Sequence, residues 1–500
     1  MPRCSRTRGA PARSSEVLWR GGRVHGPGGG GLGRYTSLLA HRPFRSLLFA
    51  GALSFAAPSA TLVVLVWSLA TAYPPNLSAN ALGQFSALAL SFLGLSATVP
   101  TLVSAIFSGT LADRMPRRRL MRWTNALGLV GTLGLMAVLY AQPSSPVALP
   151  GPPGFYLPLW VLLLFPLWAL VTVGVTIFRP AFNASLPRVV STAELGSANG
   201  LVYAVAIAFS VLGSLGAPLL IGPFGLGPSL VFAVGLFAAT QLVLVGVTSK
   251  VDPPPTAVAR RRRFLADAGD GYRYLWHRRE LLEITVSALL INLFSAVAFV
   301  ELALYVKVWL AADNALLVGG MLAGASLGAG LGSVLVGRLH FEKRAGRLLA
   351  LLTVLQGAAV VVLAVSRSPW ISVPDMFLFG VFPGMFTTIF LATIQATVPN
   401  EMLGRVLAAD EVGSYSMVPF GQYTGGLITL YGGVQITYLA AGIGTIGVGL
   451  VMGLARRVRR FGFEPQEGPS MVEPPPGALG EVPIVDVAPD PAQRLASPTG

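Results

Sequence analysis

The chain has 500 residues, of which 53% are hydrophobic and only 11% are charged, whereas about a quarter of the residues in a typical soluble chain are charged. A soluble protein of this length would need a charged surface around its core, so the composition excludes one. The formal net charge of +15 does not indicate nucleic-acid binding, because basic residues are also expected on the cytoplasmic flanks of membrane helices.

Charge-free stretches indicate where membrane spans lie. Asp, Glu, Lys and Arg are absent from residues 46–112, 123–178, 195–249 and 412–455. Each stretch is long enough for two apolar helices of about 20 residues, the length that crosses a bilayer. The pattern predicts an all-α membrane protein with many spans.

The first 44 residues precede the first apolar run. Residues 1–44 are rich in Gly and Arg and are predicted to form a disordered basic tail, which also fits an overlong start assignment. No signal peptide is expected, because the apolar run that begins near residue 46 is too long for a signal-peptide core. The single cysteine, Cys4, lies in this tail, so no disulfide is expected.

Beyond this tail the chain divides into two halves. Apolar runs predict an N-terminal half, residues 45–249, and a C-terminal half, residues 284–460, with six helices in each. A polar cytoplasmic linker, 250–283, joins them, and a Pro- and acid-rich tail, 461–500, is predicted to be disordered. The predicted helices cover roughly residues 46–73, 82–112, 121–141, 155–179, 197–222, 228–249, 284–308, 314–338, 347–366, 370–395, 406–431 and 434–455.

The distribution of basic residues predicts the orientation. With twelve spans and the N-terminus inside, 34 of the 36 Lys and Arg residues lie in cytoplasmic segments. The exceptions, Lys307 and Arg367, lie at predicted outer helix ends. An odd number of spans would destroy this pattern, so the positive-inside rule predicts a multi-pass protein of the inner (plasma) membrane with both termini cytoplasmic.

The two halves carry matching cytoplasmic loops. Residues 109–119 after the second helix correspond to residues 337–347 after the eighth. Residues 184–187 after the fourth helix correspond to residues 396–399 after the tenth. Two six-helix halves with matching loops are typical of repeat-built transporters, in which the substrate path lies between the halves.

The loop at residues 109–119 is the most specific motif and predicts an inner gate. Gly109 allows close helix packing. Asp113 can face the positive N-terminal end of a neighbouring helix or pair with Arg114 or Arg117, and Arg118 continues the basic cluster. Such contacts would hold the gate shut until a conformational change breaks them. The alternative is a generic basic turn that obeys the positive-inside rule.

This loop resembles the segment between helices 2 and 3 of the major facilitator superfamily, Gly-x-Leu-Ala-Asp-Arg-x-Gly-Arg-Arg. Pro116 stands where that pattern has Gly, which implies a stiffer loop with the same charges. Residues 41–45, 179–199 and 398–406 are similar to segments of enterobactin exporters and macrolide-efflux proteins, also called transmembrane secretion effectors.

The resemblance extends over about residues 40–456. It implies a twelve-helix fold in two six-helix repeats, alternating access and, in most relatives, export driven by proton entry. In the fifth predicted helix, Gly213, Gly216 and Pro218 resemble the Gly/Pro element of antiporters in this superfamily. Ordinary helix packing explains them equally well, because Gly and Pro are common in membrane spans.

Glycines also mark one face of the eighth predicted helix. Gly320, Gly324, Gly328 and Gly332 are spaced by four residues and therefore lie nearly in line. Such a smooth stripe lets another helix approach closely and slide. Static packing is an equally good interpretation.

Ionisable residues inside spans are costly and often functional. Glu301 is the best candidate for proton coupling, since it could take a proton from outside and release it inward. The alternative is a carboxylate wetted from the outer side. Arg405, Asp410 and Glu411, near the inner start of the eleventh predicted helix, are expected to act as a gate or helix cap, and Asp375 is expected in an outer loop.

No fixed charge is expected midway along any predicted span, and this determines the character expected for the substrate cavity. It would then be apolar, aromatic and amide-lined, which suits amphipathic or lipophilic cargo of the drug or siderophore type. Asn292, Gln395, Gln422, Tyr415 and Tyr423 are candidate lining residues, although each could equally bond between helices.

Other classes fit less well. The four His residues lie outside the predicted spans and the single Cys lies in the tail, so we expect no metal site, cofactor or His-based catalytic triad in the membrane. No phosphate-binding glycine loop with a following Lys is present, which disfavours an ATP-driven pump. The sequence therefore predicts a secondary exporter whose partners are the lipid bilayer, a small-molecule substrate and protons. An importer and a non-transporting sensor of the same fold remain alternatives.

Overall fold

The computed structural model describes residues 31–71, 79–142, 146–148, 156–191, 194–252, 264–339 and 344–462. Residues 1–30, the linker segment 253–263 and residues 463–500, which belong to the predicted tails and linker, lie outside the described part. The described chain is almost entirely helical.

The N-terminal half contains six long helices and a few short elements. Each long helix coincides with one of the predicted apolar runs, with its ends shifted by a few residues. The elements are α1 (Gly31–Ala40), α2 (Arg42–Ala70), α3 (Ala79–Arg114), α4 (Arg117–Ala141), β1 (Pro146–Ala148), β2 (Tyr156–Pro158), α5 (Leu159–Ser185), η1 (Leu186–Arg188), α6 (Leu195–Phe224), α7 (Leu226–Ser229), α8 (Val231–Val245) and η3 (Ser249–Val251).

The second part of the described chain begins with a helix in the predicted linker, which we call the linker helix, and continues with the C-terminal half. Its elements are α9 (Phe264–His277), α10 (Arg279–Val300), α11 (Leu302–Leu304), the π-helical turn η4 (Tyr305–Trp309), α12 (Ala315–Val336), α13 (Ala345–Val365), α14 (Pro369–Thr397), α15 (Asn400–Tyr415), α16 (Val418–Leu454) and α17 (Arg456–Arg460).

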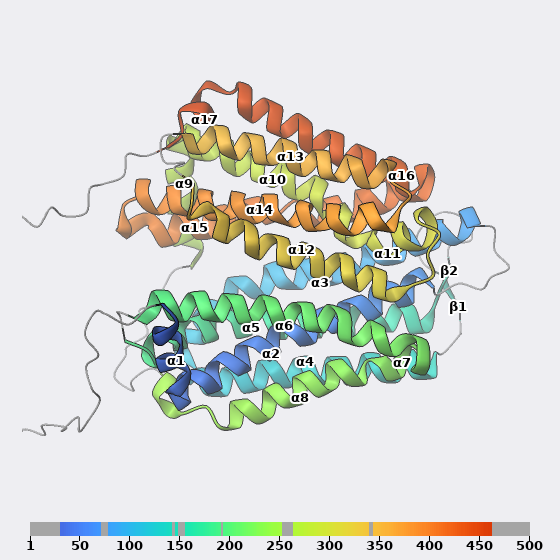
Figure 1. Cartoon of the computed structure of the whole chain (residues 1–500), viewed down its shortest axis with the longest axis horizontal. Helices are drawn as coiled ribbons and strands as arrows, with labels where there is room; N and C mark the ends of the chain where they lie inside the picture. The colour runs from blue at the N-terminus through green and yellow to red at the C-terminus, as the bar shows by residue number, and fades with distance from the viewer. Residues whose placement is uncertain are drawn as a thin grey trace, which may run out of the picture.

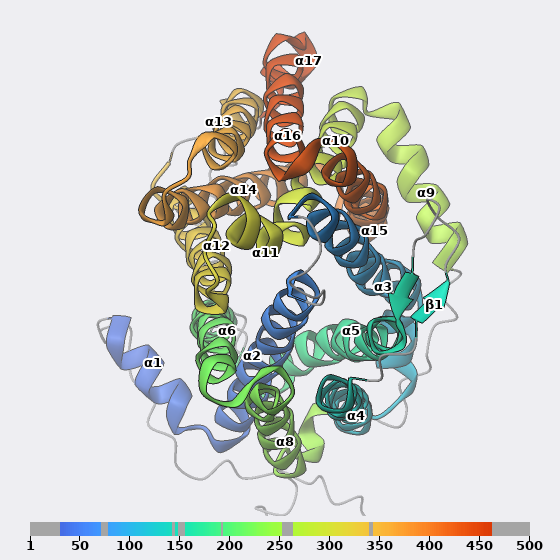
Figure 2. The same cartoon turned by 90° about the vertical axis from the view of Figure 1, so that its right-hand side faces the viewer.

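The two halves lie side by side (Figure 1). Helix α3 packs against α5 of its own half and against α16 of the other half, and α6 packs against α12. Helices α1, α9 and α17 lie at one end of the bundle, which we call the linker end. The strands β1 and β2, which pair antiparallel with Val147 opposite Leu157, and the short helix α11 lie at the other, the hairpin end (Figures 1 and 2).

Eleven helices of the described chain are long and apolar enough to cross a membrane. The last of these candidates, Met402–Leu454, has 53 residues, and a straight helix of that length would extend about 80 Å. It contains a reversal, because Gly433 has φ 82° and ψ 166°. A hydrogen bond of 2.9 Å joins the Thr429 and Thr437 hydroxyls across it, so the chain turns back at the hairpin end.

Local chemistry explains how these helices persist in lipid. Buried hydroxyls donate to the carbonyl four residues back within the same helix, as Thr61 does to Ala57 (2.9 Å) and Thr353 to Leu349 (2.9 Å). These hydroxyl donors are then not left facing hydrocarbon. Proline stands in the first turn of α14, where its missing N–H costs no intrahelical bond.

Four expectations need correction. Residues 31–40 form helix α1, with Leu38 buried, and not a disordered tail, because an apolar face packs there. The seventh predicted helix is interrupted at Glu301 and continues as η4. The eleventh begins at Asn400 and breaks after Tyr415. Asp375 is not a loop residue, since it lies inside α14 and is buried.

Candidate functional site

The predicted inner-gate loop connects α3 and α4 at the linker end. Gly109, Asp113 and Arg114 fall in the last turns of α3, but their side-chain surroundings lie outside the described part of the structure. Arg117 Nη1 donates to the Ala184 carbonyl oxygen at 2.6 Å. The backbone N–H of Arg118 donates to Asp252 Oδ1 at 2.9 Å.

These contacts join the loop to the end of α5 and to the residue that follows η3. They also bring together two motifs that the sequence marks separately, the basic loop and the segment at residues 184–187. The contacts of Arg117 with the Ala184 and Val251 carbonyl groups, and those of Arg118 with Asp252, therefore brace the N-terminal side of the molecule.

A charged cluster faces the boundary between the halves closer to the linker end. Arg179 lies within α5, six residues before its end, and its guanidinium carbon is 4.9 Å from the centroid of the Phe55 ring in α2. Across the boundary it interacts electrostatically with Glu411 and Tyr415 of α15. The side chains of Arg179, Glu411 and Tyr415 are exposed, and we call these three residues the Arg179 cluster.

Sequence reasoning missed the role of Arg179. Its predicted helix ended at residue 179, which made the residue a flank, whereas α5 continues to Ser185. Arg179 therefore lies inside the helix near its inner end, and the expectation that no fixed charge lies midway along a span is not contradicted here. Arg179 precedes Pro180, and the helix continues through this proline, so the usual helix-ending signal was misleading.

The other predicted gate residues stabilise α15 from within the C-terminal half. Asp410 Oδ1 accepts hydrogen bonds from the hydroxyls of Thr285 (2.6 Å) and Ser414 (3.4 Å). Arg405 forms an ion pair of 3.0 Å with Asp270 of the linker helix α9. These bonds connect α9, α10 and α15, so the linker helix is fixed to the C-terminal half.

The linker helix also contributes a tyrosine near Asp410. Burial raises the pKa of Tyr272, and the nearby Asp410 carboxylate raises it further. Gly271 lies so close to the Arg405 carbonyl that a Cβ atom there would clash with α15. The helix therefore docks through a short, well-defined contact.

Glu301 lies at the opposite end of the C-terminal half. Its side chain is 0% exposed, and neither carboxylate oxygen has a hydrogen-bond partner within the described residues. It caps α10, at the break before α11 and η4. Sequence reasoning identified this residue, but the position is fully enclosed and not wetted.

A small group of buried polar side chains surrounds Glu301. Tyr438 interacts electrostatically with Glu301 and Tyr305, and its hydroxyl donates to the Ala298 carbonyl at 3.0 Å. The Tyr305 and Tyr438 rings lie 5.0 Å apart. The Tyr305 and Ser372 hydroxyls are 2.7 Å apart. We call Glu301, Tyr305, Ser372, Asp375 and Tyr438 the buried acid cluster.

Asp375 completes this cluster on α14. The residue is 7% exposed, interacts electrostatically with Tyr305 and has one carboxylate oxygen, Oδ2, without a hydrogen-bond partner within the described part of the chain. Two acidic residues of different helices thus stand at either side of a pair of tyrosines. Three carboxylate oxygens of this cluster, both of Glu301 and Oδ2 of Asp375, are therefore buried without a hydrogen-bond partner within the described residues.

The two halves meet tightly beside this cluster. Helix α11 packs against both α2 and α3 at the hairpin end (Figure 2). Lys307 Nζ lies 5.7 Å from the centroid of the Trp67 ring in α2 and 3.7 Å from Asp313 Oδ1. By contrast, α5 forms no extended contact with α14 or α15 among the described residues.

The proposed lining residues fall into two groups. Asn292 donates to the Ser414 carbonyl at 3.0 Å, beside the Arg179 cluster, and Tyr415 and Gln395 are exposed. Gln422, in contrast, accepts from Thr98 of α3 at 3.1 Å. Tyr423 lies against Phe92 of the same helix, with 6.4 Å between ring centroids. The last two therefore join the halves.

The glycine motifs mark close packing. Cβ atoms at Gly328 and Gly332 would clash with the Phe377 and Val381 carbonyls of α14, while Gly324 has ordinary contacts there and Gly320 has no neighbour within 4 Å. The stripe is thus mainly an α12–α14 contact inside one half. In α6, Gly213 lies against Ala56 of α2 and Gly216 against Phe232.

Contacts that cross between the halves use other small residues. Gly319 of α12 lies against the Ser214 carbonyl and Pro218 of α6, and Gly426 of α16 lies against Ser91 of α3. Pro218 thus lies at the boundary between the halves. For metals, the described residues contain no group of three or more His, Cys, Asp or Glu side chains that could hold an ion.

Two bundles of apolar helices with polar clusters at their boundary define a membrane transporter. The family model of the Major Facilitator Superfamily matches residues 47–422, and the chain belongs to this superfamily. It is therefore a multi-pass membrane transport protein and not an enzyme.

Two relatives and one solved structure show how far the similarity extends. The chain is 23% identical to the multidrug efflux pump Tap of Mycolicibacterium fortuitum, covering 84% of this chain and 97% of Tap. It is 26% identical to the enterobactin exporter EntS of Citrobacter koseri, covering 74% of this chain and 84% of EntS. The inward open xylose transporter XylE from E. coli superposes with a TM-score of 0.60 at 14% identity, covering 84% of this chain and 95% of XylE.

Proposed function

We propose that this protein is a proton-coupled exporter of small amphipathic molecules, of the drug or siderophore type, in the inner membrane. The names of its relatives Tap and EntS support export. The exposed aromatic and cationic side chains of the Arg179 cluster suit cargo that carries both an apolar body and a polar group.

We propose twelve spans with both termini in the cytoplasm. The reversal at Gly433 divides the longest candidate span into two. The first and last described helices lie at the same end of the bundle (Figure 1). Keeping 34 of the 36 basic residues on the cytoplasmic side requires the linker end to face inward. The conformation described here is then closed outward, with the Arg179 cluster facing the cytoplasm.

The observation that carries proton coupling is the fully buried, unpartnered carboxyl of Glu301. An unpaired carboxylate ion in such a place costs several kcal/mol, so we propose that Glu301 holds a proton in this conformation. Losing that proton to the cytoplasm would leave an ion beside the outward seal. The ion would favour the conformation in which the seal opens and water reaches Glu301.

This linkage gives the cycle of an exporter. With cargo bound from the cytoplasm and Glu301 ionised, the outward-open conformation is favoured and cargo leaves. A proton from outside then neutralises Glu301, and the halves return. Because the proton acts only through its different affinity for the two conformations, one carboxyl is sufficient.

Flux through the purified, full-length protein tests the proposal. Proteoliposomes would be loaded with a fluorescent lipophilic cation, and the dye would be followed under an imposed pH gradient. We expect gradient-driven movement of the dye, which stops when a protonophore removes the gradient. Dye binding without flux would favour a sensor, and movement of dye in the same direction as protons would favour an importer.

The inner-gate loop offers a second arm for this experiment. The carboxylate of Asp113 was predicted to hold the gate, so the Asp113→Asn variant should lose flux while still binding dye. Cells with and without the protein, compared across a panel of drugs and siderophores, would narrow the substrate class.

A further inference from the structure

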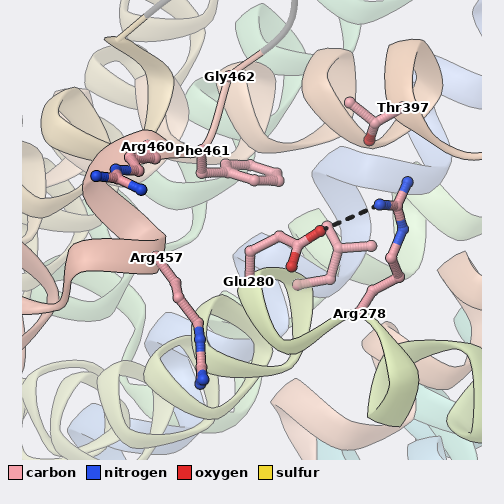
Figure 3. Close-up of a pocket in the computed structure, with 8 residues that line it drawn as sticks. Arg278, Glu280, Thr397, Arg457, Arg460, Phe461 and Gly462 are labelled. Carbon is pink, nitrogen blue, oxygen red and sulfur yellow. Dashed lines mark ion pairs between the residues drawn. The ribbon is translucent and has the colours of Figure 1, made fainter.

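A basic pocket lies at the linker end of the C-terminal half, away from the boundary between the halves. It has a volume of about 380 Å³, within the range of small-molecule sites. Arg278, Glu280 and Leu281 line it at the start of α10, and Thr397 at the end of α14. Residues of α17 and just beyond complete the lining: Arg457, Arg460, Phe461 and Gly462 (Figure 3).

The charges of this pocket are predominantly positive. Three arginines and one glutamate line it, and Arg278 pairs with Glu280 at 3.5 Å (Figure 3). A hydrogen bond to Tyr274 raises the pKa of Arg278, so it stays charged. Arg457 pairs with Glu283 at 2.9 Å. The side chain of Arg460 has no ion pair or hydrogen bond within the part of the chain that the structure describes, so its charge is available to an anion.

An apolar groove begins where this pocket ends. Arg457 lines both, and the groove, of about 830 Å³, runs between α10 and the second part of α16. Its walls include Val286, Leu290, Val451 and Met452. Val286 is 46% exposed and Val451 is 67% exposed. Both helices are candidate spans, so these apolar side chains face the hydrocarbon of the membrane.

We propose that the pocket and the groove together bind one anionic phospholipid. Its phosphate would lie against Arg460, Arg457 and Arg278, and one acyl chain would lie along the groove beside Val451. Basic pockets between spanning helices at the cytoplasmic side suit anionic headgroups. Arginine can pair with the phosphate through two parallel hydrogen bonds. A zwitterionic lipid fits less well, because its ammonium group would be repelled by the same arginines.

The bound lipid would connect three elements of the C-terminal half. Helix α17 already packs on α13, where Gly346 lies against the Val458 carbonyl and the N–H of Gly346 donates to the Phe461 carbonyl at 2.9 Å. A phosphate held between α17 and α10 would extend this contact to the first helix of the half. The site would thus make the C-terminal half more stable in an anionic membrane. The proposal does not depend on export or on proton coupling.

Native mass spectrometry of the full-length protein, released from detergent, tests the site. Phosphatidylglycerol, phosphatidylcholine and inorganic phosphate would be titrated separately. We expect one tightly retained phosphatidylglycerol, no comparable phosphatidylcholine and no retained phosphate. Equal retention of phosphatidylcholine would overturn the proposal, and so would retention of inorganic phosphate that displaces the lipid, because the site would then be a simple anion pocket.

Three variants locate the bound lipid. Arg460→Gln should weaken phosphatidylglycerol retention roughly fivefold, the effect of losing one basic group near an anionic surface. Val451→Trp should fill the groove and weaken it as well, although no charge changes. Arg459→Gln is the matched control, because Arg459 is an exposed arginine of α17 that lines neither pocket nor groove.

Thermal unfolding of the same three variants gives a second readout. Added phosphatidylglycerol should raise the unfolding temperature of the unmodified chain and of Arg459→Gln, and should do so less for the other two. Equal weakening of lipid retention in all three, or none in any, would refute the location. Comparable unfolding temperatures without lipid would show that the variants are folded.

Discussion

The two halves share a fold but differ in their buried charges. Within the N-terminal half, α2, α4, α5, α6 and α8 contain no acidic residue, and Asp113 lies next to the end of α3. The C-terminal half holds Glu301 and Asp375 in a buried cluster, and Asp410 and Glu411 in α15. The same scaffold therefore supplies one half whose listed helices carry no acidic residue and another that carries the buried carboxyl groups.

This asymmetry assigns different tasks to the halves. In the proposed cycle, the buried and unpaired carboxyl of Glu301 is the group through which protons act on the C-terminal half. The N-terminal half contributes the surfaces against which the other half closes: Trp67 against Lys307 at the hairpin end, and Arg179 opposite Glu411 toward the linker end. The proposed coupling therefore uses residues from both halves, although the proton binds to only one of them.

The largest effect is expected from Glu301→Gln. The amide cannot ionise, so proton gradients should no longer drive flux, and gradient-driven dye movement should fall to background. Exchange of dye between the two sides without a gradient should persist, because the neutral side chain still allows the halves to move. Both are measured in proteoliposomes at matched protein content.

Asp313→Asn is the control for this variant, since the Asp313 side chain is 82% exposed and pairs with Lys307. It should retain gradient-driven flux. If Glu301→Gln retained it too, the asymmetry between the halves would have no role in coupling.

The sequence predicts those features of this asymmetry that depend on hydropathy and charge pattern, and not those that depend on tertiary packing. The helices and the candidacy of Glu301 follow from hydropathy and from the rarity of charges in spans. The enclosure of Glu301 could not be predicted, because it depends on a helix break followed by α11, which packs against α2 and α3, and by a π turn. Arg179 was misplaced because the end of α5 is set by packing beyond Pro180.

The contacts of the linker helix could not be predicted from the sequence either. The linker was recognised as polar, but the amphipathic α9 is fixed by tertiary contacts of Gly271 and Asp270 with α15. Likewise, the glycine stripe was visible as a smooth face, while its partner, α14 of the same half, could not be read from the spacing alone.

A second test asks whether α12 and α14 pack closely against each other within the C-terminal half. A Cβ at residue 328 would meet the Phe377 carbonyl of α14, so Gly328→Ala should force α12 and α14 apart and destabilise the protein by about 1–3 kcal/mol. The measurement is the thermal unfolding midpoint in detergent.

Gly320→Ala is the matched control, because the same methyl group would have no neighbour within 4 Å. Its midpoint should stay within the effect of an ordinary surface change, about 0.5 kcal/mol. Equal midpoints for the two variants would mean that the stripe is not a close α12–α14 contact.

A third test addresses the contact between the halves at the Arg179 cluster. Arg179→Gln removes the charge that faces Glu411, and Glu411→Gln removes its counterpart. Each should slow dye flux severalfold, and the double variant should be no slower than the slower single variant, because both remove one interaction. Arg188→Gln, which changes an exposed arginine in η1 at the same end, should leave the flux unchanged. Additive losses would show that the two groups act separately.

The smallest effect concerns the linker helix and whether it belongs to the C-terminal half. Arg405 and Asp270 form a 3.0 Å ion pair, but their side chains are 41% and 54% exposed, and exposed pairs contribute only about 0.2–1 kcal/mol. Arg405→Gln should therefore lower the unfolding midpoint slightly, and less so at high salt. It should also increase hydrogen exchange in α9 while leaving exchange in α8 unchanged, because the linker helix is held by α15 and α10. Faster exchange on the N-terminal side of the linker would instead show that α9 is held by both halves. The linker helix would then not belong to the acidic C-terminal half alone.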